Sequence, residues 1–325
     1  MIMQGMRRLV ILLAVAAVAL APAVPAAAAP LGDVSPLNLG SLGDWYSGAS
    51  GLNDRDQVVG YYTNTSDMSK RLAFVWNRGK LTPLDAVTPG SFAEAKAINN
   101  RGTIVGTSVG ALGMVATVWV NGKPSALSNV ESSANAINDR GQTVGQQAGR
   151  AARWDNGRPV TLEQLSGTTL SDAKGINARG EAVGECETPT SHVCTWDRLG
   201  HVKDLGLGIG AAINDAGTVA GIDASQGGLE TWHPAIYKHG KVTRLAGTPQ
   251  YYNTVTGINN REQVTGGYGN RAVIWQRGQV VTLPSLATQY VGTSGSAINQ
   301  SGHVAGSTNG EPPPNVTPGY PTLWR

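Results

Sequence analysis

Residues 97–106 read AINNRGTIVG, and six other segments of the chain follow the same pattern. The seven copies are GLNDRDQVVG (51–60), AINNRGTIVG (97–106), AINDRGQTVG (136–145), GINARGEAVG (175–184), AINDAGTVAG (212–221), GINNREQVTG (257–266) and AINQSGHVAG (297–306). Their asparagines follow one another at intervals of 46, 39, 39, 37, 45 and 40 residues. A period of this length indicates a repeat architecture, in which one supersecondary unit recurs along the chain.

A second block follows each copy, with an aromatic residue before a turn and a closing leucine in most repeats, as in ATVWVNGKPSAL (116–127). The repeat aromatics are Trp76, Trp119, Trp154, Trp196, Tyr237, Trp275 and Trp324. Each repeat therefore predicts four short strands, which end at the asparagine, at a glycine, at the aromatic and at the leucine. We expect an all-β chain folded as a seven-bladed β-propeller with four antiparallel strands per blade.

The last repeat ends at Arg325, one strand short of the others. The missing strand has a counterpart at the other end of the chain, because VSPLNLGS (34–41) resembles LTPLDAVTPGS (81–91). We therefore expect the N-terminal segment to supply the outer strand of the last blade and close the ring, which removes an exposed sheet edge.

The residue types at three positions of the repeat have a physical explanation. The residue two before each asparagine is glycine or alanine, which suits strands that converge on a central channel. The asparagine opens a turn, and the glycine three residues later fits a left-handed backbone conformation, so Asp56 and Glu262, which replace it, should have positive φ. The glycine seven after each asparagine is invariant within the chain, and we expect it to lie opposite the aromatic, Gly184 facing Trp196.

Cys186 and Cys194 are the two cysteines of the chain. Neither lies in a CxxC motif, and an antiparallel hairpin would bring them together. We predict a disulfide between them, which agrees with export to an oxidising compartment.

These motifs resemble the HAF repeat family of extracellular proteins, named for a His-Ala-Phe stretch before the aromatic. The resemblance covers residues 34–325 and rests on the paired IN..G.xVG and A..W..G elements; only Ala73–Phe74 keeps the Ala-Phe pair. It implies an exported repeat protein and no particular activity.

The first 28 residues read as a cleavable signal peptide, with Arg7 and Arg8 before an apolar stretch from Leu9 to Leu20 and alanines at the cleavage zone. We expect a single propeller domain over 29–325, secreted and monomeric. Loss of the two arginines lowers the formal net charge from +3 to +1. A chain this close to neutrality has no electrostatic footprint for nucleic acid, and no other run approaches the length of a membrane span.

Aromatic residues outside the repeat positions fall in the longer loops, which the strand order places on one face, around the channel mouth. We expect a saccharide, a peptide or an envelope component as the ligand there, because exposed aromatic rings bury apolar area while their edges still form hydrogen bonds. Packing between blades is the alternative role. The candidate binding residues are Trp45, Tyr46, Tyr61, Tyr62, Trp232, His233, Tyr251 and Tyr252.

No catalytic constellation, metal-ligand spacing or cofactor motif is found in the sequence, which favours a secreted binding module over an enzyme. Two alternatives remain, an extracellular glycan hydrolase or lyase using carboxylates at the channel mouth, and a structural surface protein. Hydrolysis would need two carboxylates within about 5–10 Å of each other in the central pocket. The loop carboxylates available for this are Asp44, Asp67, Glu94, Glu131, Asp172, Glu187, Asp223 and Glu230.

Overall fold

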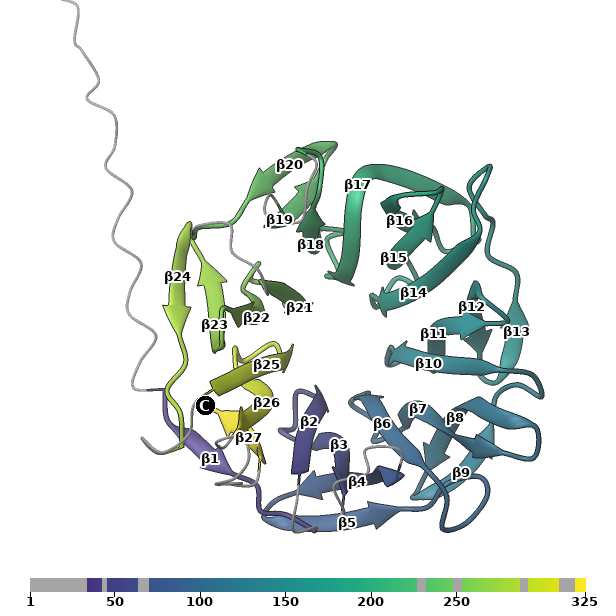
Figure 1. Ribbon diagram of the computed structural model, residues 1–325, viewed down its shortest axis with the longest axis vertical. Helices are drawn as coiled ribbons and strands as arrows, with labels where there is room; N and C mark the ends of the chain where they lie inside the picture. The colour runs from purple at the N-terminus through teal and green to yellow at the C-terminus, as the bar shows by residue number, and fades with distance from the viewer. Residues whose placement is uncertain are drawn as a thin grey trace, which may run out of the picture.

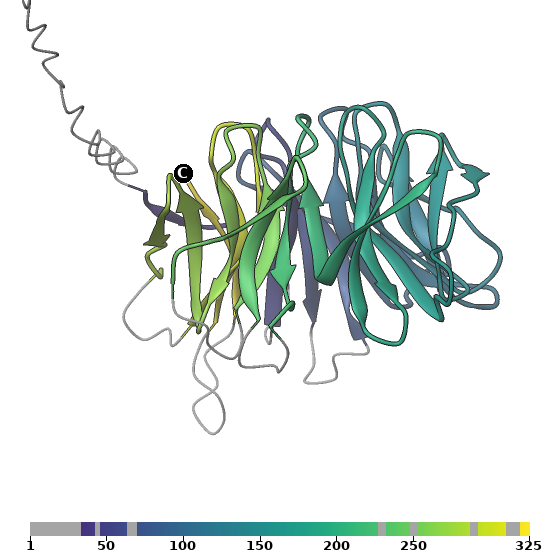
Figure 2. The same cartoon turned by 90° about the horizontal axis from the view of Figure 1, so that it is seen from above.

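The computed structural model describes residues 34–42, 46–63, 70–226, 232–247, 253–286, 292–309 and 319–325. Over these ranges the chain forms antiparallel sheets and no α-helix. The sheets are arranged radially about a central axis (Figure 1), and Figure 2 shows them side by side in a disc. The prediction of an all-β chain built from four-strand antiparallel units is confirmed.

Five sheets have four strands each. Three of them are formed by the first part of the chain: β2 (Tyr46–Leu52), β3 (Val58–Thr63), β4 (Leu72–Asn77) and β5 (Lys80–Leu84); β6 (Ala93–Ile98), β7 (Ile104–Gly110), β8 (Gly113–Val120) and β9 (Lys123–Ala126); β10 (Ser132–Ile137), β11 (Gln142–Gln147), β12 (Arg150–Asp155) and β13 (Arg158–Val160). A fourth consists of β21 (Thr254–Ile258), β22 (Val264–Tyr268), β23 (Arg271–Gln276) and β24 (Gln279–Thr282).

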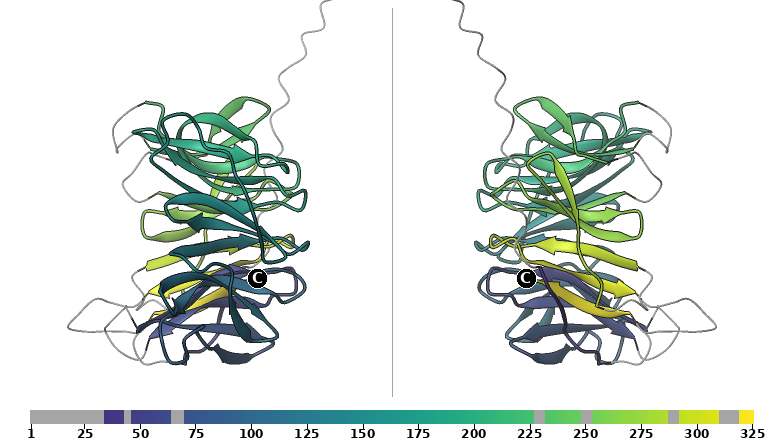
Figure 3. Two further views of the ribbon diagram at one scale, coloured as in Figure 1. Left: turned by 90° about the vertical axis from the view of Figure 1, so that its right-hand side faces the viewer. Right: turned by 90° about the vertical axis from the view of Figure 1, so that its left-hand side faces the viewer.

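The fifth four-stranded sheet joins the two ends of the described chain. Its order is β1-β27-β26-β25, formed by β1 (Pro36–Asn38), β25 (Gly292–Ile298), β26 (Val304–Asn309) and β27 (Tyr320–Trp324). Strand β1 pairs antiparallel with β27, with Pro36 opposite Trp324. Figure 1 shows β1 beside β27, and in Figure 3 purple N-terminal strands lie next to yellow C-terminal strands.

A sixth sheet has seven strands: β14 (Leu170–Ile176), β15 (Ala182–Glu187), β16 (Ser191–Trp196), β17 (Val202–Ile213), β18 (Val219–Asp223), β19 (His233–Lys238) and β20 (Lys241–Arg244). Its strand β17 has 12 residues and serves two repeats, because its first part pairs with β16 and its last part with β18. The linker explains this: Leu205 and the next repeat asparagine, Asn214, are so close in sequence that no loop separates the strands.

The invariant glycines do not face the aromatics, so that part of the prediction is wrong. Gly184 lies opposite Cys194, while Trp196 lies opposite Ala182. The requirement for glycine comes from the innermost strand, which carries a β-bulge; a Cβ on Gly184 would lie 1.8 Å from the carbonyl oxygen of Asp172. The same Cβ would lie 1.8–2.3 Å from a backbone oxygen at all seven positions, which are Gly60, Gly106, Gly145, Gly184, Gly221, Gly266 and Gly306.

The repeat tryptophans instead pack between neighbouring sheets. Four of them donate an indole hydrogen bond to a backbone carbonyl just after the last strand of the preceding repeat: Trp119 to Asp85 (2.7 Å), Trp196 to Glu163 (2.8 Å), Trp275 to Ala246 (2.9 Å) and Trp324 to Pro284 (2.6 Å). All four are almost completely buried. Each therefore joins apolar packing to a satisfied polar group across a junction between sheets.

The repeat asparagines link the sheets at the axis. Each Oδ1 accepts hydrogen bonds from backbone N–H groups two and four residues later, as predicted for a turn, and each Nδ2 donates to the backbone carbonyl of the corresponding asparagine in the next repeat. These Nδ2 bonds run Asn53 to Asn99 (2.9 Å), Asn99 to Asn138 (3.1 Å), Asn138 to Asn177 (2.9 Å), Asn177 to Asn214 (3.0 Å), Asn214 to Asn259 (3.2 Å), Asn259 to Asn299 (3.1 Å) and Asn299 to Asn53 (3.2 Å). The seven bonds form a continuous cycle.

A second set of hydrogen bonds lies beside this cycle, formed by the residue after each asparagine. The backbone N–H of Asp54, for example, donates to Oδ1 of Asn100 at 2.8 Å, and the N–H of Gln300 donates to Oδ1 of Asp54 at 2.8 Å. The set is interrupted where Ala178 offers no side-chain acceptor. The turn residues Asp56 and Glu262 have φ of 56° and 59°, which confirms the prediction of a left-handed conformation.

Candidate functional site

The β-bulge of the innermost strand directs one side chain per repeat to the axis. In each repeat the register skips the residue three before the asparagine, as between Ala95 and Ala97. The skipped residues are Ser50, Lys96, Asn135, Lys174, Ala211, Thr256 and Ser296. All seven line an axial cavity of about 240 Å³, together with the small residues predicted to surround the channel. We call this set of seven the channel ring.

The channel ring is chemically asymmetric. Three consecutive repeats contribute Lys96, Asn135 and Lys174, whereas the other four contribute alanine or a hydroxyl-bearing residue. The ammonium group of Lys96 donates to Oδ1 of Asn135 at 3.0 Å. The Asn135 amide in turn donates to Oδ1 of Asp172 at 2.7 Å, so one connected polar network covers this side of the channel.

Two carboxylates, Asp172 and Glu185, lie next to the lysines of the channel ring. Lys174 forms an ion pair of 2.7 Å with Glu185, which lies directly opposite Asp172 on the neighbouring strand. Burial raises the pKa of Asp172, while Lys174 and Lys96 counteract the shift. A carboxyl group with a raised pKa beside a second carboxylate is an arrangement found in acid–base sites. Among the described residues, no carboxylate lines this 240 Å³ cavity, so neither Asp172 nor Glu185 meets the condition set for hydrolysis in the central pocket. The adjoining axial cavity of about 280 Å³, at the asparagine turns, is lined by Asp54, Asp139 and Asp215.

Two of the predicted aromatic residues form a second cluster, between the first and last repeats. The rings of Tyr46 and Tyr61 have centroids 6.1 Å apart, and the Arg71 guanidinium lies 4.3 Å from the centroid of the Tyr61 ring. Arg71 also pairs with Glu94 at 3.2 Å, and the Tyr46 hydroxyl donates to Oδ1 of Asn309 at 2.9 Å. Cation–π contact and hydrogen bonds hold these rings in fixed positions.

Both tyrosines of this cluster keep their protons at physiological pH. Burial is the main cause that raises the pKa of Tyr46 and of Tyr61 above the ordinary value of 10.0. Their hydroxyls therefore act as hydrogen-bond donors as well as acceptors. Glu94 lies on β6, two residues before the channel-ring residue Lys96.

The remaining predicted site residues do not join these groups. Tyr62 is only 7% exposed and packs in a core cluster with Phe74, so it offers little surface to a ligand. Trp232 is half-buried against the cluster around Ile222, and His233 lies opposite Asp223. Trp45, Tyr251 and Tyr252 lie outside the described residues, as do Asp44, Asp67 and Glu230.

Asp223 has a structural partner. It is 4% exposed and forms an ion pair of 2.8 Å with Arg244. Burial acts to raise its pKa, but hydrogen bonds from Ser225 and Arg244 outweigh that effect and lower it. Asp223 therefore stays ionised and connects β18 to the outer strand of the same repeat.

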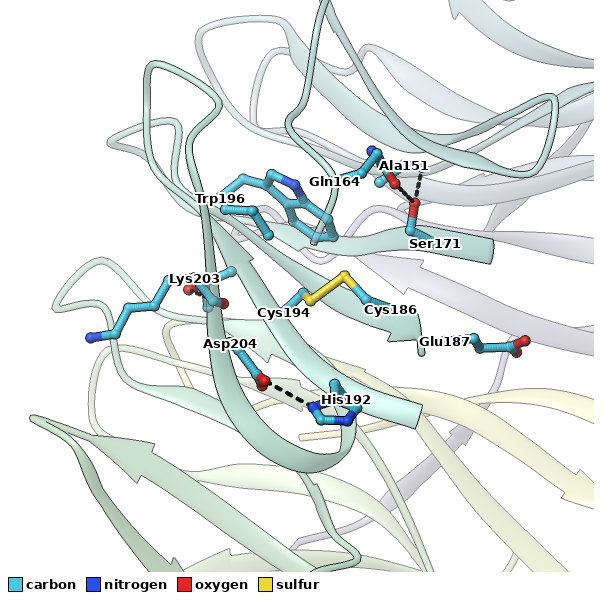
Figure 4. The surroundings of a disulfide bond; sticks show 12 residues. Ala151, Gln164, Ser171, Cys186, Glu187, His192, Cys194, Trp196, Lys203 and Asp204 are labelled. Atoms are coloured by element: carbon cyan, nitrogen blue, oxygen red, sulfur yellow. Dashed lines mark hydrogen bonds and ion pairs between the residues drawn. A yellow bond between two sulfur atoms is a disulfide. The ribbon is translucent and has the colours of Figure 1, made fainter. Parts of the chain in front are cut away.

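The predicted disulfide is present: Cys186 and Cys194 are bonded, with Cα atoms 6.0 Å apart (Figure 4). The two residues are diagonal neighbours on β15 and β16 rather than directly opposite, because Cys186 faces His192. Among the described residues, no three histidine, cysteine, aspartate or glutamate side chains gather in a way that could hold a metal ion. That part of the chain also has no helix long and apolar enough to cross a membrane.

Sequence reasoning missed the channel ring. A signal for it exists: the position three before each asparagine varies between lysine, asparagine, alanine, threonine and serine, although its neighbours hardly vary. Only the bulge, which the sequence does not reveal directly, turns this variable position toward the axis.

Radial antiparallel sheets around an axial cavity define a β-propeller. No family model matches the chain, and no curated protein sequence matches it. Among solved structures it is similar to a gluconolactonase from Xanthomonas campestris, at 14% identity and a TM-score of 0.45, over 90% of this chain and 89% of the other. It is also similar to a fungal alcohol oxidase in complex with copper, at 12% identity and a TM-score of 0.51, over 89% of this chain and 75% of the other. At these identities the likeness concerns the fold alone.

Proposed function

We propose that residues 29–325 form a single secreted propeller of seven blades. In this arrangement the seven-stranded sheet counts as two blades that share β17, and β1 completes the last blade. The cycle of asparagine hydrogen bonds supports this count, since it passes once through each repeat and returns from Asn299 to Asn53. Secretion through a cleaved signal peptide and membership of the HAF repeat family belong to the same proposal, and the disulfide is compatible with export.

The function that the geometry supports best is ligand binding at the long-loop mouth of the channel. The observation that carries this proposal is the asymmetry of the channel ring. A repeat protein with a purely structural role has no reason to place Lys96, Asn135 and Lys174 side by side on one side of its axis. Function in repeat proteins usually depends on such departures from the repeat, because the scaffold positions are already satisfied.

A polar ligand without high net charge suits this site. The two lysines are balanced by Asp172 and Glu185, and the Asn135 amide holds the network together, so the site offers both donors and acceptors. The Tyr46 and Tyr61 rings add an apolar face of the kind that packs against sugar rings or peptide side chains. A saccharide or a peptide therefore fits the chemistry better than a nucleic acid.

The test is binding of the purified mature protein to a panel of polysaccharides, cell-wall fragments and peptides, followed by tryptophan fluorescence. We expect saturable binding that weakens about tenfold or more in Lys96→Ala/Lys174→Ala, because hydrogen bonds from charged groups contribute about 1.5–3 kcal/mol each. The matched control is Ser50→Ala/Thr256→Ala, at the same position of two other repeats. Equal affinities for both variants, or no binding to any member of the panel, would contradict the proposal.

The second candidate is a glycan hydrolase or lyase that would use Asp172, which lies behind the channel ring and binds Asn135 there. Its raised pKa and the opposed Glu185 suit a general acid beside a second carboxylate. Turnover of any bound glycan, lost in Asp172→Asn while binding persists, would establish this function. Binding without turnover would leave the binding module as the function of the site.

A further inference from the structure

A cleft of about 670 Å³ lies where two repeats share β17, away from the channel mouth. It opens among the short turns that follow Trp196, Ile213 and Lys238, on the face opposite the long loops. Its volume is in the range of small-molecule sites in proteins. Neither the channel ring nor the tyrosine cluster lines it.

The cleft exists because this junction lacks two features that fill the space at other junctions, a linker loop and a tryptophan that packs on it. At four junctions, a tryptophan of one repeat packs on the linker after the preceding repeat and donates to a carbonyl there. Here the preceding repeat runs straight into β17 without a linker loop, and the aromatic is Tyr237. The Tyr237 hydroxyl donates to the carbonyl of Ile222 within its own sheet at 3.0 Å, so it does not bridge to the neighbouring repeat.

Apolar and charged side chains line the cleft together. Leu205, Ile213 and Val242 supply its accessible apolar surface, because Trp196, Val219 and Tyr237, which lie next to them, are at most 5% exposed. Most of the charged rim side chains already have partners. The pairs are Asp197 with His201 (3.0 Å), Arg179 with Glu181 (2.7 Å), Asp204 with His192 (2.9 Å; Figure 4) and Lys238 with Glu262 (2.5 Å).

Two rim lysines differ from the rest. Lys203 on β17 and Lys241 on β20 come from the two repeats that border the cleft, and both line it. Among the described residues neither forms an ion pair, since the nearby carboxylates bind other side chains. Two unpaired ammonium groups at the rim of one apolar cleft favour an anion, because the attraction strengthens as water is excluded.

We propose that this cleft binds a small organic anion with a ring-shaped apolar body. The ring packs against Leu205, Ile213 and Val242, and a carboxylate, sulfate or sulfonate group is held by Lys203 and Lys241. This site is independent of the ligand site proposed at the channel mouth.

The experiment uses 8-anilinonaphthalene-1-sulfonate, an aromatic sulfonate whose fluorescence rises on binding to an apolar site. We expect saturable binding to the mature protein with one ligand per chain. Affinity should fall about tenfold or more in Lys203→Ala/Lys241→Ala. The neutral analogue N-phenyl-1-naphthylamine, which has the same rings, should respond much less to that substitution.

Three variants make the result specific. Lys80→Ala/Lys123→Ala removes the same charge from lysines that follow the equivalent turn glycines in two other repeats, and should leave the affinity unchanged. Ala216→Trp places a bulky side chain at the exposed rim and should abolish binding. Lys96→Ala/Lys174→Ala should have no effect, which separates this site from the channel mouth. Unsaturable binding, or equal affinity in the wild type, Lys203→Ala/Lys241→Ala and Ala216→Trp, would overturn the proposal.

Discussion

The side-chain amide of Asn299 donates a hydrogen bond of 3.2 Å to the backbone carbonyl of Asn53, 246 residues earlier in the chain. The same bond joins each pair of successive repeats, so the last repeat meets the first through the contact that joins all the others. A second contact supports this junction: Nδ1 of His303 lies 2.8 Å from Oδ1 of Asp56. The first and last repeats are therefore neighbours in the same sense as any two consecutive repeats.

Because of the asparagine cycle, we expect substitution of a single one of its asparagines to lower the stability of the fold strongly. Asn259 is completely buried; its Oδ1 accepts from Arg261 and Gln263, and its Nδ2 donates to Asn299. Asn259→Ala leaves these buried groups unpaired, and we expect a loss of about 2–4 kcal/mol in the free energy of unfolding. Asn260→Ala, an exposed neighbour, is the control and should cost less than about 1 kcal/mol. Urea unfolding of both variants decides, and equal costs would contradict a role for the cycle.

The bulge predicts that the invariant glycines tolerate no side chain. Gly184→Ala would bring a Cβ to 1.8 Å from the Asp172 carbonyl oxygen, and the strand must shift. We expect a cost of about 3 kcal/mol, at the upper end of overpacking effects. Gly79 has φ of 87° and open space around it, so Gly79→Ala should cost only about 1 kcal/mol. Thermal unfolding compares the two, and a smaller cost at Gly184 would show that the bulge relaxes.

We expect the N-terminal segment to stabilise the junction between the first and last repeats. Leu39 follows β1, is 4% exposed and packs in a cluster with Trp76 and Leu323. Leu39→Ala should lower the free energy of unfolding by about 2–4 kcal/mol, because it leaves a cavity. Leu199→Ala, at a side chain that is 62% exposed, should change it by less than about 0.5 kcal/mol. If the two variants unfold alike, the segment does not hold the ring together.

The disulfide predicts a redox-dependent stability. Cys186 and Cys194 lie eight positions apart in the chain and are completely buried. Closing a loop of this length stabilises a fold by about 2–3 kcal/mol in the chain-entropy description. We expect dithiothreitol to lower the melting temperature of the wild type and to leave that of Cys186→Ala/Cys194→Ala unchanged. An equal response of both proteins would mean that the bond is not formed in solution.

In the turn between β16 and β17, we expect neighbouring carboxylates to shift the pKa of His201. The hydrogen bond to Asp197, followed by its charge and that of Glu163, raises the pKa of His201 above 6.5. In turn, the hydrogen bond from His201 lowers the pKa of Asp197 to about 2. The contribution of His201 to the stability of the fold is thus present below pH 6.5 and is lost as the pH rises through its raised pKa. The contribution of Asp197 to stability is present above pH 3.8 and is lost as the pH falls toward about 2.

Nuclear magnetic resonance titration of the imidazole measures this effect. Asp197→Asn should return the pKa of His201 toward 6.5, whereas Asp204→Asn, which removes a carboxylate bound to a different histidine, should leave it raised. The same pKa in Asp197→Asn as in the wild type would contradict the contact.

Much of the fold could be predicted from the sequence because the repeat is local. The spacing of asparagine, glycine and aromatic residues within one repeat predicts its strands and turns, and the left-handed Asp56 and Glu262 follow from comparison with the other copies. The pairing of Cys186 with Cys194 was predictable for the same reason, since a single hairpin contains both. Each of these features depends on residues that are neighbours in the chain.

The candidate sites depended on the tertiary structure. Whether Gly184 faces Trp196 or Cys194 depends on the hairpin register, and the sequence allowed both. The bulge that turns Lys96 and Lys174 toward the axis arises from how the innermost strand meets its neighbour, and similar residue patterns form strands with and without bulges. The cleft beside Tyr237 needs two adjacent repeats and a missing linker at once.

The sequence by itself therefore determined the repeating unit, its turns and its disulfide, because hydrogen bonds and side-chain size act over a few residues. Only the tertiary structure decided which variable residues share the axis and where two repeats leave a cleft. These are relationships between segments about 40 residues apart, and backbone packing across repeats sets them.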